Sequence, residues 1–205
     1  MNIIDKTVKK ERDSDNINDG VSENEAKNAI KTLLKWIGED PEREGLLETP
    51  KRVLKAYKEW FAGYNQNPKE ILSKTFREVD GYDRMIVLSN ISFSSYCEHH
   101  IAPISGKVSI GYLPKGKIVG LSKLARLVDV FAKRLQVQEK MTAQIANALQ
   151  SNLECEGVAV LVEAEHHCMC TRGVNKLGTS MKTSYFTGEL KKDIEKREEF
   201  FRSIS

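Results

Sequence analysis

The sequence predicts an α+β domain in which two helices cover one face of an antiparallel sheet. Segments rich in β-branched and aromatic residues flank two long amphipathic stretches, in the order strand, strand, helix, helix, strand, strand. A pair of amphipathic helices precedes this core, and a polar, charged segment precedes the pair. We therefore expect three parts: a flexible tail at 1–22, a helical hairpin at 23–65 and the main domain at 66–205.

The N-terminal third is interpreted from composition and periodicity. Residues 1–19 lack the apolar core of a secretory signal. From Glu23 to Ile37 apolar residues recur at helical spacing, and the segment 38–41, which ends in proline, closes this helix. Thr49 and Pro50 are typical of an N-cap followed by the first residue of a second helix.

Each element of the main domain is predicted from its own pattern. Strands are expected at residues 85–94, 106–113, 157–163 and 180–187. The two inner helices are expected to carry their apolar stripes at 121–131 and 141–153, and a short charged helix is expected at 191–201.

Composition limits the possible partners and the location. The chain has 205 residues and a net charge of only +3, which indicates neither nucleic acid nor a membrane as a partner. No apolar run approaches the length of a membrane span. We therefore expect a cytoplasmic protein, whose four cysteines (Cys97, Cys155, Cys168 and Cys170) are ligands or core residues rather than disulfides.

All four histidines lie in two short clusters that also contain cysteine, at residues 97–100 and 166–168. Cys97 and His100 have the C-x-x-H spacing, and thiolate with imidazole suits zinc. In a plain strand these two side chains would face opposite sides, so they can share an ion only if the segment turns. The second cluster is expected at the end of a strand, where side chains alternate, so His166, Cys168 and Cys170 should share one face and Cys168 can reach the metal.

Two kinds of zinc site are compatible with these residues. A closed structural site would use four ligands: Cys97, His100, Cys168 and Cys170. An open site would omit Cys170, because the C-x-C spacing of Cys168 and Cys170 is rarer in ligand pairs than C-x-x-C. It would keep one position for a water with a pKa of about 7. His99 and His166 would then be free to transfer protons.

Cationic residues predict an anion site beside the metal. Lys123 and Arg126 lie one turn apart at the start of the first inner helix, where they oppose the helix dipole unless an anion also binds there. Arg172 follows the second cluster, and Arg52 and Lys55 in the hairpin could add to the site. Each cation alone would be interpreted as solvated surface charge, but the set favours an anionic ligand.

Gln138 and Glu139 open the second inner helix. A carboxylate there is favourable for the helix dipole, so capping alone would account for it. Glu139 could also accept two hydrogen bonds from a guanine-like edge that carries N–H and NH₂ groups.

Eight segments together resemble GTP cyclohydrolase I, and the resemblance spans about residues 24–203. They are Gly38–Pro41, Arg43–Leu47, Thr49–Val53, Cys97–His100, Gly120–Arg126, Gln136–Glu139, His166–Met169 and Arg172–Gly173. The resemblance implies the tunnelling fold, in a homodecamer of two stacked pentamers with active sites at subunit boundaries. It also implies a zinc enzyme that attacks C8 of GTP with water and yields 7,8-dihydroneopterin triphosphate and formate, the entry to folate or tetrahydrobiopterin.

The resemblance also implies a role for each site residue. The zinc ligands would be Cys97, His100 and Cys168, and the proton-transfer residues would be His99 and His166. Ser122 would lie near the ribose, and Glu139 with Gln138 would read the guanine. The triphosphate would be held by Lys123, Arg126, Arg172, Arg52 and Lys55.

Cys170 departs from the family pattern, which does not require a cysteine there, and we expect it to be buried and without function. The alternative to the enzyme is a zinc-stabilised module without catalysis that binds a nucleotide or a protein partner.

Overall fold

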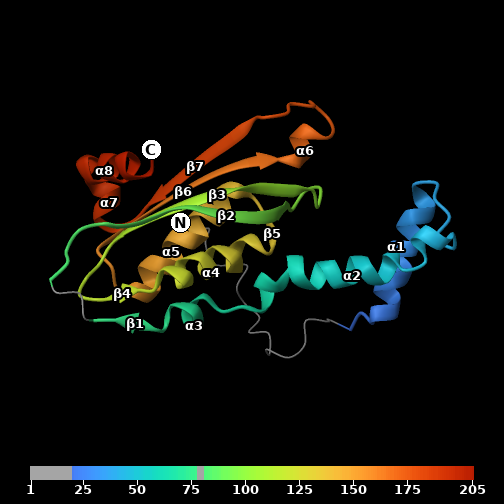
Figure 1. Cartoon of the computed structure of the whole chain (residues 1–205), viewed down its shortest axis with the longest axis horizontal. Coiled ribbons are helices and arrows are strands. Elements are labelled where there is room, and N and C mark those ends of the chain that lie inside the picture. The colour runs from blue at the N-terminus through green and yellow to red at the C-terminus, as the bar shows by residue number, and fades with distance from the viewer. Residues whose placement is uncertain (1–19, 78–80) are drawn as a thin grey trace, which may run out of the picture. The chain divides into compact units, whose positions relative to one another are not determined.

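The computed structural model describes residues 20–77 and 81–205, so nearly all of the predicted tail lies outside the described residues (Figure 1). The chain divides into two compact units between Glu59 and Trp60. The hairpin was predicted to extend to residue 65, but residues 61–65 bond within the second unit. Gly63 N–H donates to Lys133 O at 3.0 Å, and Arg134 Nη2 donates to Gly63 O at 2.8 Å.

The first unit contains the predicted helices. They are α1 (Glu23–Trp36) and α2 (Thr49–Trp60), and the 3-10 turn η1 (Glu44–Leu46), which was not predicted, lies between them. Ser22 caps α1 in a capping box with Glu25, a start signal that periodicity alone does not identify. The first helical bond of α2 runs from Arg52 N–H to Glu48 O at 3.0 Å, so α2 begins one residue earlier than predicted.

The second unit has the predicted order of four strands and two helices. These elements are β2 (Ile86–Cys97), β3 (Pro103–Leu113), α4 (Leu121–Ala132), α5 (Gln138–Leu153), β6 (Gly157–His166) and β7 (Ser180–Phe186). The short elements that were not predicted are η2 (Ala62–Asn65), α3 (Pro68–Leu72), β1 (Thr75–Phe76), β4 (Ile118–Val119), β5 (Leu135–Gln136) and α6 (His167–Cys170). No helix in the described part of the chain is both long and apolar enough to cross a membrane.

The main sheet has the order β5-β2-β3-β6-β7, and its four long strands are antiparallel. Alternation along β3 sends Val108, Ile110 and Tyr112 into the large core that α4 and α5 share, whereas Leu113 joins a smaller cluster on the other face. Helices α4 and α5 lie together on one side of the sheet (Figure 1). The predicted α+β architecture, with the order ββααββ and both inner helices on one face of the sheet, is confirmed.

The other face of the sheet is partly covered by the C-terminal segment (Figure 1). The prediction of one helix here is wrong, because the segment forms α7 (Gly188–Lys192) and α8 (Ile194–Ile204). Asp193 separates them, and its Oδ1 accepts from the N–H groups of Glu195 and Lys196 at the start of α8. Phe200 of α8 is fully buried over Gly111, where a Cβ atom would lie 2.7 Å from its ring.

Candidate metal centre

The first cluster lies in a turn at the end of β2. The N–H groups of His100 and Ile101 donate to Cys97 O at 3.3 and 2.8 Å, and Ile101 adopts the left-handed φ of 54° that reverses the chain. This turn brings His100 Nδ1 to 3.8 Å from Cys97 Sγ. The condition under which Cys97 and His100 can share an ion is therefore met.

The second cluster does not continue the strand. β6 ends at His166, and residues 167–170 form the single helical turn α6, in which Thr171 N–H donates to His167 O at 2.9 Å. The prediction that Cys168 and Cys170 share a strand face with His166 is therefore wrong. Residues i and i+2 share a face in a strand but point in different directions in a helix. The helical turn therefore separates Cys168 from Cys170, and Cys168 lies beside the first cluster.

Three side chains converge into a group that could hold a metal: Cys97, His100 and Cys168. Their ligand atoms all lie within 4.8 Å of one another, and ligand atoms around a tetrahedral zinc lie roughly 3.5–3.8 Å apart. The pKa of Cys168 is raised, first by burial and then by the neighbouring Cys97 thiol. Two thiolates at this spacing repel, so a bound cation would stabilise both in the form that metals bind.

Cys170 is directed to a different partner. Its thiol donates to Glu165 Oε1 at 3.1 Å, and this bond is the main cause of its raised pKa. Gly178 N–H donates to the same carboxylate oxygen. The cysteine is buried, as predicted, and no disulfide joins it to Cys168. The geometry therefore favours three ligands over the closed four-ligand site.

The two remaining histidines of interest differ in environment. His99 is exposed, with Nδ1 3.6 Å from Cys97 Sγ. His166 is half-buried, and its Nε2 lies 3.0 Å from Gln138 Oε1. Burial lowers the pKa of His166, Glu139 opposes this shift, and His167 adds to it. The lowered pKa favours the neutral imidazole, which is the form that accepts a proton.

The predicted cations lie on three different elements. Ser122, Lys123 and Arg126 occupy the first two turns of α4, and Lys123 N–H bonds to Gly120 O at 2.8 Å. Arg172 follows α6, with Nη1 3.0 Å from His100 Nε2. Arg52 and Lys55 belong to α2, in the first unit.

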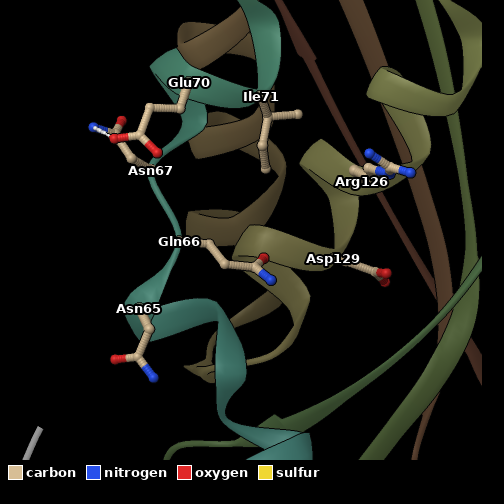
Figure 2. Close-up of a pocket in the computed structure, with 7 residues that line it drawn as sticks. All are labelled: Asn65, Gln66, Asn67, Glu70, Ile71, Arg126 and Asp129. Carbon is tan, nitrogen blue, oxygen red and sulfur yellow. Dashed lines mark hydrogen bonds between the residues drawn. The ribbon is translucent and has the colours of Figure 1, made fainter. Parts of the chain in front are cut away.

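Arg126 also lines a polar cavity of about 430 Å³ (Figure 2). The other lining residues come from the η2–α3 segment and α4: Asn65, Gln66, Asn67, Glu70, Ile71 and Asp129. Two of these are carboxylates, which disfavour an anion. Arg126 is the one predicted site residue in this lining, so the cavity is separate from the group of cysteine and histidine ligands.

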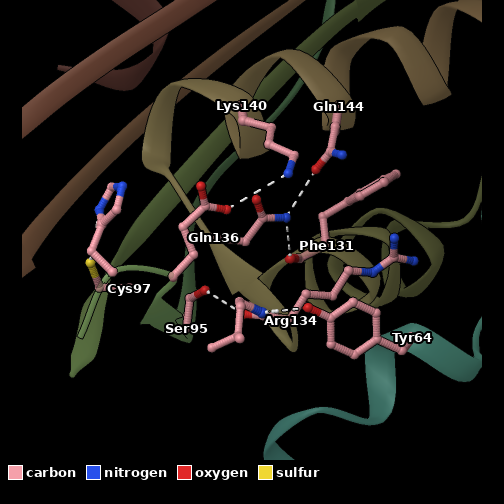
Figure 3. Close-up of polar contacts among 11 residues, drawn as sticks. Tyr64, Ser95, Cys97, Phe131, Arg134, Gln136, Lys140 and Gln144 are labelled. Carbon is pink, nitrogen blue, oxygen red and sulfur yellow. Dashed lines mark hydrogen bonds and ion pairs between the residues drawn. The ribbon is translucent and has the colours of Figure 1, made fainter. Parts of the chain in front are cut away.

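The strand β5 supports the first cluster, and it was not predicted. Cys97 pairs with Gln136 in the parallel β2–β5 contact, and Glu98 N–H donates to Gln136 O at 3.0 Å. Gln136 Nε2 in turn donates to Phe131 O and Gln144 Oε1 (Figure 3). A strand of two residues leaves no periodic signal, and the sequence pointed to this segment only through the family motif at Gln136–Glu139.

The fold and the three-residue group define an α+β protein with a candidate metal site. A sequence model described as GTP cyclohydrolase I matches residues 26–205. The protein named GTP cyclohydrolase 1 from Pelagibacter ubique is 55% identical over 185 residues, which cover 90% of this chain and 92% of that protein. The one from Brucella canis is 56% identical over 180 residues, or 88% of this chain and 84% of that protein. The chain therefore belongs to the GTP cyclohydrolase I family.

Among solved structures, the archaeosine synthase QueF-like in its apo form is 17% identical. The alignment covers 51% of this chain and 93% of that chain, with a TM-score of 0.43.

Proposed function

We propose that this protein is a zinc-dependent GTP cyclohydrolase I that hydrolyses the imidazole ring of GTP at C8 and yields 7,8-dihydroneopterin triphosphate and formate. The observation that carries the proposal is the group of Cys97, His100 and Cys168 in a chain that is 55–56% identical to proteins named GTP cyclohydrolase 1. The family membership supports the reaction, and the ligand group supports the kind of site.

We assign the metal ligands to Cys97, His100 and Cys168 and the metal to zinc, because two thiolates and an imidazole suit zinc better than magnesium or calcium. Bound zinc would supply a Lewis acid that lowers the pKa of a water to about 7. His166, which is half-buried and has a lowered pKa, would accept a proton during ring opening. His99, exposed beside Cys97, would be the second proton-transfer residue.

The triphosphate is assigned to the cations Lys123, Arg126, Arg172, Arg52 and Lys55. The contact between Arg172 and His100 supports one of these assignments. A guanidinium only donates, so the 3.0 Å contact requires His100 Nε2 to accept. If His100 held a metal through Nδ1, Nε2 would carry the proton and could no longer accept from Arg172, so Arg172 would be available to an anion.

The nucleoside part of the substrate is assigned to the starts of the two inner helices. Ser122 on α4 would contact the ribose. Glu139 on α5 would accept hydrogen bonds from the N–H and NH₂ groups of guanine, since a carboxylate matches two donors in one plane.

A homodecamer of two pentamers, with sites at subunit boundaries, is part of the proposal. In the described residues β7 pairs with β6 alone, and the outer edge of β2 pairs with β5 only at Tyr96 and Cys97. Such edges are templates for a strand from another copy. In the loop after the second cluster, Val174 and Leu177 expose 61% and 79% of their surface, which suits a contact with a neighbouring subunit.

The test is turnover of GTP by metal-replete, assembled protein, with zinc content and mass determined on the same sample. Formate and a pterin that fluoresces after oxidation are expected in equal amounts. If zinc-loaded rings bind GTP and are stabilised by it without forming either product, the catalytic proposal is wrong and a non-catalytic nucleotide-binding module takes its place.

A further inference from the structure

We propose that the side chain of Gln138 positions His166 and presents its Nδ1 as the proton-accepting atom, a role that rests on the function proposed above. It differs from the role that the sequence predicted for Gln138, which was to read the guanine beside Glu139. The argument depends on which hydrogen-bonding groups surround the Gln138 amide.

The amide of Gln138 is held in one orientation. The residue begins α5 and is only 2% exposed. Its Nε2 lies 3.1 Å from Val162 O, 3.0 Å from Met181 O and 3.1 Å from Thr183 Oγ1. Backbone carbonyls can only accept, so this end must be the NH₂ group, and a flipped amide would bring its oxygen against two others.

Two threonines extend the same directional order. Thr142 Oγ1 donates to Gln138 O at 2.7 Å, and Thr142 and Thr183 hydroxyls lie 2.7 Å apart. The single hydroxyl hydrogen of Thr142 is already donated to Gln138 O. Thr183 must therefore donate to Thr142 Oγ1, and its own oxygen accepts from Gln138 Nε2. The bonds form a closed ring in which every donor has an acceptor, and they tie the start of α5 to β6 and β7.

The orientation of the amide determines the tautomer of His166. Gln138 Oε1 faces His166 Nε2 at 3.0 Å, so Nε2 must carry the hydrogen. A histidine that acts as a base is neutral and has only one N–H, so with Nε2 protonated the lone pair of His166 lies on Nδ1. The same bond limits rotation of the ring. Gln138 thus determines which nitrogen of His166 can accept a proton and in which direction it points.

A residue that reads guanine needs a free hydrogen-bonding edge. Both ends of the Gln138 amide are already occupied by protein groups, and the residue is buried. Its removal should therefore lower the rate of the chemical step rather than weaken binding of GTP. Glu139, the next residue, keeps the assignment to guanine.

The first test is Gln138→Leu in the zinc-replete assembled protein. We expect kcat to fall by about 100-fold, the lower end of the contribution from a positioned proton-transfer group, and KM for GTP to change less than about 3-fold. The matched control is Gln150→Leu on the same helix. Gln150 also bonds at both ends, to Cys155 O and Thr187 Oγ1, but not to His166, and its loss should leave kcat within about 3-fold. A raised KM with unchanged kcat in Gln138→Leu would return the residue to guanine binding and overturn the proposal.

The second test needs no turnover, and its decisive measurement is made on the unaltered protein. The chain has only four histidines, so ¹⁵N ring signals of the zinc-replete, GTP-free protein can be assigned to His166 by comparison with His166→Gln. The Nε2–H tautomer is expected in the unaltered protein, and a mixture is expected in Gln138→Leu. An Nδ1–H tautomer in the unaltered protein would overturn the proposal. This ¹⁵N signal does not depend on GTP hydrolysis. If the protein fails to hydrolyse GTP, the proposed function is refuted, and the ¹⁵N spectrum still shows whether Gln138 sets the tautomer of His166.

Discussion

The two cysteine–histidine clusters reach the same point by different backbone routes. The first is a turn at the end of β2, where a left-handed Ile101 reverses the chain and leaves two exposed imidazoles. The second is a single helical turn after β6, in which Cys168 faces the first cluster. The spacing of cysteine and histidine therefore pointed to both clusters. It implied the turn that the first cluster forms but not the helical turn of the second.

The clusters also differ in how firmly their histidines are held. His99 and His100 are exposed, and a bound ion would orient His100 through a metal–ligand bond. His166 is half-buried and bonds to a glutamine that the sheet holds in one orientation. This difference suggests a division of work: the first cluster contributes mainly to metal binding, and His166 contributes to proton transfer.

The largest effect is expected from removing a ligand. Cys97→Ala, His100→Ala and Cys168→Ala should each lose zinc and lower GTP turnover by at least about 10⁴-fold, because the Lewis acid goes with the ligand. Zinc content by elemental analysis and formate release measure the two losses together. Cys155→Ala is the control, since that thiol is buried away from the group and burial raises its pKa to about 11. Full zinc content in any of the three variants would remove that residue from the ligand set.

His166→Gln should separate metal binding from chemistry. Zinc content should stay at the level of the unaltered protein, while kcat falls by about 10²–10⁴-fold, the usual contribution of a general acid or base. His167→Gln, at the start of the same turn, is the matched control and should change kcat by less than about 3-fold. Loss of zinc in His166→Gln would make the two clusters equal partners in binding the ion.

Arg172→Ala tests whether the second cluster also delivers a cation to the substrate. A charge-assisted hydrogen bond contributes about 1.5–3 kcal/mol, so KM for GTP should rise by roughly 10-fold or more while zinc is retained. Lys176→Ala, in the same loop, is the control for general loss of positive charge. An unchanged KM would show that Arg172 does not contact the triphosphate.

The smallest effect is expected for Cys170→Ala. Zinc content and kcat should remain within about 2-fold, because the thiol bonds to Glu165 rather than to the ligand group. The free energy of unfolding should fall by about 1 kcal/mol for the lost hydrogen bond, measured by denaturant titration. Glu165 would still accept from Gly178 N–H. If zinc affinity drops sharply instead, Cys170 is a ligand and the site is closed.

Elements with a long periodic pattern could be predicted, and elements of two to five residues could not. The four long strands and the two inner helices each repeat their apolar positions several times, so the pattern is clear in one sequence. β5 and α6 are too short to repeat anything, yet β5 supports Cys97 and α6 turns Cys168 toward it. The C-terminal helix was predicted as one piece because its break depends on a single capping residue, Asp193.

The α+β class, the candidate ligands and the family could be predicted from the sequence, because these depend on periodicity, residue chemistry and the order of motifs. The grouping of Cys168 with Cys97 and His100 was also expected, but the folded chain was needed to show that a helical turn brings Cys168 there, that Cys170 bonds to Glu165 and that Gln138 faces His166. Most of these contacts link residues on different elements. The others depend on the helical turn α6, whose conformation follows from its own hydrogen bonds. Their geometry follows from how α5, β6 and the β2 turn pack, which no local pattern encodes.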